Sequence, residues 1–256
     1  MQRYFVPPEQ LEGNLARLTG DDAHHLVKVM RAEPGEEIII SNGLDREVLA
    51  RVSDIGKGLV EAEVVRELPM DKEATVEVWI AQSLPKGDKL ETVIQKCTEL
   101  GADRFIPFLS KRTVVQYDDK KEAKRVERWS KIAKEAAEQA HRNRVPAVET
   151  PVSWKRLLEL VKETDLALFC YELESGLTLR ERLAEQLSSP AADGRRPRIL
   201  VLVGPEGGFT EQEALEAEAA GCRSISLGKR ILRTETAAMA ALACIMYESG
   251  EMGGKS

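Results

Sequence analysis

The residues best suited to hold a ligand form one short run, Gly204-Pro205-Glu206-Gly207-Gly208-Phe209-Thr210, directly after the apolar stretch 199–203. Glycine lets a backbone approach a ligand closely, and proline stiffens the turn. Thr210 and Glu213 have the spacing of a capping box, so a helix should begin there. Because open α/β sheets bind ligands at the carboxyl ends of their strands, the run predicts a binding bend, with a purely structural turn as the alternative.

A second run of this kind is Leu227-Gly228-Lys229-Arg230-Ile231-Leu232-Arg233-Thr234-Glu235-Thr236-Ala237-Ala238. It also follows an expected strand and leads into a helix whose small residues permit close packing. Thr234 is a natural N-cap, which would place Arg233 just before a helix N-terminus, where positive potential collects. Two such runs in successive units of one sheet predict a composite pocket.

The elements that must position these runs change character near residue 70. Before it, short strands alternate with glycine turns, as in a small barrel, and a helix is expected over 21–31. After it, strands and helices alternate, which is typical of an α/β domain with a mostly parallel sheet. The expected strands are 37–41, 47–52, 59–65, 75–81, 104–109, 166–171, 199–203 and 224–227. The expected helices are 88–100, 123–139, 211–220 and 235–247. A capping box of Asp88 and Glu91 should begin the first of these helices.

Composition and charge indicate a globular protein without a membrane span and leave open a local contact with RNA. Hydrophobic residues make up 43% and charged residues 31%, and the net charge is −6, an ordinary globular composition with no run that could span a bilayer. Residues 111–144 hold eleven Lys or Arg against six Asp or Glu, leaving −11 for the rest. A basic segment on an acidic body suits local RNA contact, although a solvated, salt-bridged helix explains it equally well.

Cysteine and histidine patterns give no metal site. Cys97, Cys170, Cys222 and Cys244 lie far apart in apolar stretches, so we interpret them as small buried hydrophobes. No His, Cys and carboxylate cluster has the spacing of metal ligands. The N-terminus lacks the apolar core of a signal peptide, and we therefore expect a cytoplasmic protein without metal or membrane.

Taken together, the two runs resemble the SPOUT methyltransferases, and within them the 16S ribosomal RNA (uracil-N3)-methyltransferases. The same family pattern is visible in segments 84–89 and 95–101, in Glu138-Gln139 with Arg142, and near the N-terminus in 3–5, 24–26 and 29–31. The resemblance covers nearly the whole chain, and the paired C-terminal runs are its specific part.

The resemblance implies an N-terminal PUA-like β-barrel for RNA over residues 1–70 and a SPOUT domain over 73–250. The latter is an α/β domain with a mostly parallel, trefoil-knotted sheet, although true knots are rare among folds. It further implies a homodimer and S-adenosylmethionine as the cofactor, held by three segments. The residues that it assigns to the cofactor are Cys170, Tyr171, Glu172, Val203, Gly204, Pro205, Glu206, Gly207, Leu227, Gly228, Ile231, Leu232 and Arg233.

The implied reaction is an in-line attack of uridine N3 on the methyl carbon. Deprotonated N3 is an anion, so catalysis needs orientation and charge stabilisation. We expect Arg233 to be the stabiliser. Glu206 is a weaker candidate for the proton acceptor or for a substrate contact, and it could equally brace its bend by accepting backbone hydrogen bonds. C5-methylation would need a cysteine nucleophile, which nothing here requires.

The implied partner is 16S ribosomal RNA in the small ribosomal subunit. Tyr4 or Phe5 could stack on a base, with packing under the barrel the more natural role for Phe5. The cationic residues expected to contact RNA are Arg3, Arg31, Lys86, Lys111, Arg112, Arg142 and Arg144.

Two other functions remain open on the residues alone. One is a SPOUT methyltransferase acting on a ribose 2′-hydroxyl or on a guanine of transfer RNA. The other is a noncatalytic RNA-binding or assembly factor that kept the fold. A nucleotide-dependent dehydrogenase fits poorly, because neither bend carries the G-x-G-x-x-G pattern.

Overall fold

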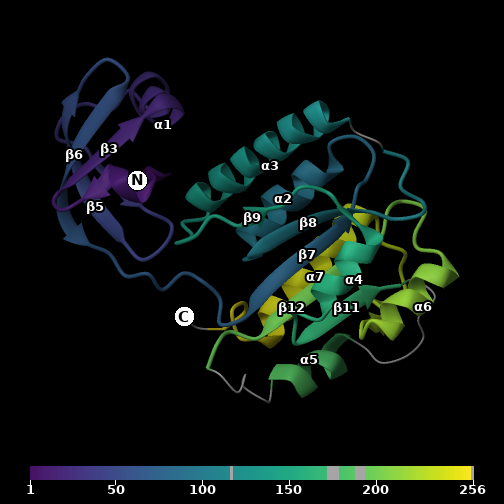
Figure 1. Cartoon of the computed structure of the whole chain (residues 1–256). Coiled ribbons are helices and arrows are strands. Elements are labelled where there is room, and N and C mark those ends of the chain that lie inside the picture. The colour runs from purple at the N-terminus through teal and green to yellow at the C-terminus, as the bar shows by residue number, and fades with distance from the viewer. Residues whose placement is uncertain (116–117, 172–178, 188–193, 255–256) are drawn as a thin grey trace. The chain divides into compact units, whose positions relative to one another are not determined.

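The computed structural model describes residues 1–115, 118–171, 179–187 and 194–254 (Figure 1). The chain divides into two compact units, one of residues 1–73 with 137–145 and one of residues 74–136 with 146–256. The short segment 137–145 therefore groups with the N-terminal residues. The domain limits expected from the sequence stay a prediction.

The first unit is built on a six-stranded sheet in the order β1-β4-β5-β6-β3-β2. Neighbouring strands are antiparallel except β1 and β4. Alternate side chains such as Ile38, Ile40 and Val52 are buried in one apolar cluster, as a half-buried sheet requires. The strands are β1 (Arg3–Phe5), β2 (Leu11–Glu12), β3 (Leu15–Thr19), β4 (Glu37–Ser41), β5 (Glu47–Ile55) and β6 (Leu59–Glu67).

The prediction of a single helix over residues 21–31 is wrong, because two shorter helical segments form there. In its place the chain forms the short α1 (Gly20–His24) and the π-helical turn η2 (His25–Val29). The 3-10 turn η1 (Pro8–Gln10) lies earlier in the chain. The helical run ends before Arg31, whose φ of 56° is left-handed. Of its apolar residues, Leu26 packs into the core, while Val29 and Met30 are exposed.

The second unit contains a parallel sheet in the order β10-β8-β7-β12-β11-β13, with β9 paired to β8. Every pair in it is parallel, which confirms the α/β class. The central strands are buried on both faces and are almost continuously apolar, as expected. The strands are β7 (Glu77–Ser83), β8 (Arg104–Leu109), β9 (Ala147–Val148), β10 (Val152–Ser153), β11 (Leu166–Cys170), β12 (Arg198–Val203) and β13 (Arg223–Ile225).

Helices cover this sheet and connect its parallel strands (Figure 1). On one face, Leu157 of α4 and Ala217 of α6 pack with Phe169 and Leu200 of the sheet in one core cluster. Helix α7 lies against β7 and β12 and contacts α2 and α5. The helices are α2 (Lys89–Glu99), α3 (Asp119–Gln139), α4 (Trp154–Val161), α5 (Leu179–Leu187), α6 (Glu211–Ala219) and α7 (Thr234–Glu248).

Three expected helix starts have different outcomes. The capping box at Thr210 and Glu213 is confirmed, with both reciprocal hydrogen bonds present. The box expected at Asp88 and Glu91 is wrong, because both carboxylates bind Arg125 instead. Thr234 is not an N-cap either; it is the first residue of α7, and its hydroxyl is used elsewhere.

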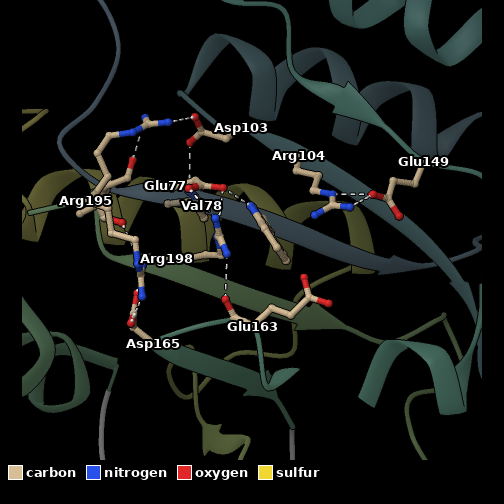
Figure 2. A network of polar contacts seen from close by, with 12 residues as sticks. Glu77, Val78, Asp103, Arg104, Glu149, Glu163, Asp165, Arg195 and Arg198 are labelled. Carbon is tan, nitrogen blue, oxygen red and sulfur yellow. Dashed lines mark hydrogen bonds and ion pairs between the residues drawn. The ribbon is translucent and has the colours of Figure 1, made fainter. Parts of the chain in front are cut away.

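A polar network holds the amino ends of the strands in the second unit. Figure 2 shows Arg198 binding Glu77 and Asp103 accepting the backbone N–H of Val78, while Arg104 pairs with Glu149. The pKa of Glu77 is lowered: burial disfavours its charge, but hydrogen bonds from Arg198 and Trp79 outweigh that cost. The network lies at the strand starts, leaving the opposite edge of the sheet to the two glycine runs.

Within the described part of the chain, no helix is long and apolar enough to cross a membrane. Nor do its His, Cys, Asp and Glu residues form a group of three that could hold a metal ion. Cys97 and Cys222 are buried as expected, whereas Cys244 is exposed on α7, so its assignment as a buried hydrophobe was wrong.

Candidate active site

One cavity of about 440 Å³ lies at the carboxyl edge of the parallel sheet. We call residues 204–210, after β12, the first bend, and residues 227–233, between β13 and α7, the second bend. Both bends line the cavity, together with the end of β11. Its lining residues are Lys89, Cys170, Tyr171, Val203, Gly204, Pro205, Glu206, Gly208, Phe209, Ile225, Ser226, Leu227, Gly228, Lys229, Arg230, Ile231, Leu232, Arg233, Thr234, Glu235 and Ala237.

A shared hydrogen bond joins the two bends. The hydroxyl of Thr234 donates to the carbonyl oxygen of Gly204 at 2.6 Å. Gln82, at the end of β7, donates from Nε2 to the Thr234 hydroxyl at 2.7 Å and lies 3.4 Å from the Gly204 carbonyl. Gln82 and Thr234 are buried, so these bonds are shielded from water. The bends are therefore neighbours, as the sequence predicted, and Gln82 is a structural part that the prediction missed.

Glycine is favoured in each bend for a different reason. A Cβ atom on Gly204 would lie 3.0 Å from the Phe209 ring, whose packing closes the first bend. Gly228 has a φ of 109°, which L side chains rarely adopt. The two glycines thus set the backbone paths along the cavity.

Glu206 is held by one donor from the segment before α2 and by one from the first residue of α2. Its Oε1 accepts from Lys89 Nζ at 2.6 Å and from the backbone N–H of Lys86 at 3.2 Å. Burial disfavours the charge, but these donors outweigh it and hold the pKa of Glu206 below its ordinary value. A weakly basic, already paired carboxylate favours the bracing role over the proton-acceptor role.

Three cations stand at the cavity without a carboxylate partner among the described residues. Lys229, Arg230 and Arg233 are exposed and line the second bend. Arg233 immediately precedes α7, as its N-cap residue. Lys229 and Arg230 were not assigned to the site from the sequence, although they lie within the run that signalled it. The positive rim suits an anionic substrate.

Most of the other residues that the sequence assigned to the cofactor lie on the wall of the cavity. Cys170, the last residue of β11, and Tyr171, which follows it, lie on the cavity wall. Burial raises the pKa of the Cys170 thiol to about 12, so it stays protonated. Leu227, Ile231 and Leu232 also line the cavity, and Ile231 is 87% exposed. Gly207 lies outside the lining, where its carbonyl accepts from Arg112 at 2.6 Å. Glu172 lies outside the described residues.

In the second unit the cationic residues expected to contact RNA are exposed. Lys86 and Lys111 present their side chains to solvent. Their backbone N–H groups donate to Glu206 and Glu213, respectively, which fixes the segments that carry them. Arg112 is exposed as well, although it contacts the first bend.

In the first unit the expectation needs correction. Arg3 and Arg142 are each only 5% exposed, Arg3 in a bidentate pair with Glu47 and Arg142 in a pair with Glu73. Buried, paired guanidinium groups cannot reach a phosphate, so we leave both out of the RNA surface. The possible base-stacking residues Tyr4 and Phe5 are also buried, whereas the remaining candidates Arg31 and Arg144 are exposed.

Comparison with protein families gives two matches along the chain. Residues 72–246 match the RNA methyltransferase domain, and residues 18–65 match the RNA methyltransferase PUA domain. The first match contains the whole parallel sheet and both bends. The second contains most of the N-terminal sheet.

Comparison with individual proteins gives relatives of the same length. The chain is 40% identical over 260 residues to ribosomal RNA small subunit methyltransferase E of Bacillus subtilis, covering 99% of each chain. It is 32% identical to the structure of a ribosomal RNA small subunit methyltransferase E from Neisseria gonorrhoeae bound to S-adenosyl methionine, covering 96% and 97% with a TM-score of 0.83. A putative methyltransferase from Legionella pneumophila, also with bound cofactor, gives 31% identity, 96% coverage of each chain and a TM-score of 0.83.

Proposed function

This chain belongs to the ribosomal RNA small subunit methyltransferase E family, and from that membership we propose that it methylates N3 of a uridine in 16S ribosomal RNA. The methyl donor is S-adenosylmethionine, and the substrate is the RNA of the small ribosomal subunit. The observation that carries the proposal is the hydrogen bond between Thr234 and Gly204, which places both bends on one cavity.

The cavity fits this donor in size and chemistry. Its volume of about 440 Å³ lies within the usual range for small-molecule sites. Backbone N–H and C=O groups of the two bends can bind the adenine edge, while Leu227, Ile231 and Leu232 offer an apolar slot. Glu235 adds a buried carboxylate oxygen without a partner among the described residues, which suits a cationic ligand.

The catalytic work assigned to the chain is orientation and charge stabilisation. When bound, S-adenosylmethionine supplies the methyl group that N3 receives. Arg233 would stabilise the uracil anion, whose negative charge spreads over O2 and O4. Glu206 braces the first bend through Lys86 and Lys89. Cys170 takes no part as a nucleophile, because its thiol stays protonated.

RNA contact is assigned to exposed cations of each unit. Phosphate attraction by Lys and Arg gives affinity, and the structured target gives specificity by its shape. Lys229 and Arg230 join the set because of their place at the cavity. The proposed RNA-contacting residues are Arg31, Lys86, Lys111, Arg112, Arg144, Lys229 and Arg230.

From the same family membership we propose that the chain forms a homodimer in the cytoplasm and that its C-terminal sheet is knotted. We also propose domain limits at residues 1–70 and 73–250. Sedimentation equilibrium should give twice the chain mass of 28.4 kDa.

Methylation of isolated small ribosomal subunits tests the reaction. Subunits from a strain that lacks this protein are incubated with the purified chain and S-adenosylmethionine, and the nucleosides are separated by mass spectrometry. We expect N3-methyluridine as the product. A 2′-O-methylated nucleoside or a methylguanosine would assign the chain another substrate, and no product with normal subunit binding would indicate an assembly factor.

A further inference from the structure

Glu235 is a carboxylate on the cavity wall that the proposed reaction does not use. It is the second residue of α7 and lines the cavity beside Arg233 and Thr234. Its Oε2 is buried, with no hydrogen-bond partner among the residues described. The other carboxylate of the wall, Glu206, is already paired with Lys89. Glu235 is therefore a half-buried wall carboxylate with one buried oxygen that no described residue pairs.

A buried carboxylate oxygen at this position needs a partner. Removing a charged oxygen from water is unfavourable unless a donor or a cation reaches it. The N-terminus of α7 offsets part of that cost, because its dipole favours negative charge in the first turn. The cations of the second bend, Lys229, Arg230 and Arg233, form no ion pair with it. The missing partner should therefore come from the molecule that enters the cavity.

We propose that Glu235 binds the positively charged part of the methyl donor. This inference rests on the proposed function, because it takes S-adenosylmethionine as the ligand. The donor carries two cationic groups, the sulfonium and the ammonium, and either one would compensate the carboxylate. Pairing with the sulfonium would have an added consequence: the neutral sulfur of the product would bind more weakly, and the product would leave more readily.

Calorimetry with three ligands tests the proposal on Glu235→Gln, which keeps the size of the side chain and removes its charge. S-adenosylmethionine carries both cationic groups, S-adenosylhomocysteine only the ammonium, and methylthioadenosine neither. The matched control is Glu211→Gln, since Glu211 lies exposed in the first turn of α6, away from the cavity. Thermal unfolding of each variant reports whether the fold is intact.

We expect Glu235→Gln to bind S-adenosylmethionine about 10- to 100-fold more weakly, with methylthioadenosine affinity changed less than about twofold. An equal loss for S-adenosylhomocysteine assigns the contact to the ammonium, and a smaller loss assigns it to the sulfonium. Equal weakening of all three ligands, or of none, overturns the proposal, as does lost turnover with unchanged donor affinity. If the wild-type chain binds no S-adenosylmethionine, the proposed function itself fails.

Discussion

Replacing Thr234 by valine should separate the two bends without emptying the site. Valine keeps the branched shape but lacks the hydroxyl that donates to Gly204 at 2.6 Å and accepts from Gln82 at 2.7 Å. The Gly204 carbonyl would keep only the Gln82 amide, 3.4 Å away. Leaving a buried polar group unpaired costs about 1–3 kcal/mol, so the free energy of unfolding should fall by that amount. For a chain of this size, that lowers Tm by roughly 2–10 °C.

The same change should weaken donor binding, because the backbone groups of both bends would no longer be held in register. Isothermal titration with S-adenosylmethionine should show a loss of about tenfold, equivalent to about 1.4 kcal/mol. Thr236→Val is the matched control, since Thr236 is exposed on the same helix and does not line the cavity. If Thr234→Val and Thr236→Val bind the donor and unfold alike, the shared hydrogen bond does not hold the two bends in register.

Three further predictions concern the chemistry and the pH response. Arg233→Ala should lower turnover on small subunits about 100- to 1,000-fold while largely sparing donor affinity, because it removes a stabiliser of transition-state charge; near-normal methylation would remove Arg233 from this role. Cys170→Ala should still form product in the same assay, since the thiol stays protonated, and complete loss of product would restore a cysteine mechanism. Glu73 resembles an acid-sensitive clamp: burial disfavours its charge, but Arg142 and the backbone N–H groups of Asn143 and Arg144 hold its pKa below the ordinary value. The stabilisation by Glu73 is therefore complete above its unfolded-state pKa and is lost as the pH falls through its folded-state pKa. In denaturant unfolding, the free energies of wild type and Glu73→Gln should differ by about 1–3 kcal/mol at pH 7 and converge in acid. A difference that does not depend on pH would contradict this role of Glu73.

Local patterns predicted most of the second unit. Continuous apolar runs identified β11 and β12, and the spacing of Thr210 and Glu213 identified the start of α6. Both bends were predicted because glycine marks positions where side chains do not fit. These features depend on residues close together in the sequence, which is why they could be predicted from the sequence alone.

The failures depend on partners far away in the sequence. Arg3 pairs with Glu47, 44 positions away, and no local pattern distinguishes such an arginine from an exposed one. Thr234 looked like an N-cap, but its hydroxyl bonds Gly204, 30 positions away. Gln82 did leave a signal, since it is a polar residue ending an apolar strand run. A buried polar residue there calls for a partner.

A map of methyl groups on the small ribosomal subunit, made with and without this protein, tests the proposed reaction in the cell. Deleting the gene should remove one methyl group, on N3 of a single uridine in 16S ribosomal RNA, and the wild-type gene should restore it while one encoding Arg233→Ala should not. An unchanged methylation map after deletion, or the loss of a methyl group from a ribose or a guanine instead, would show that this chain does not methylate N3 of a uridine.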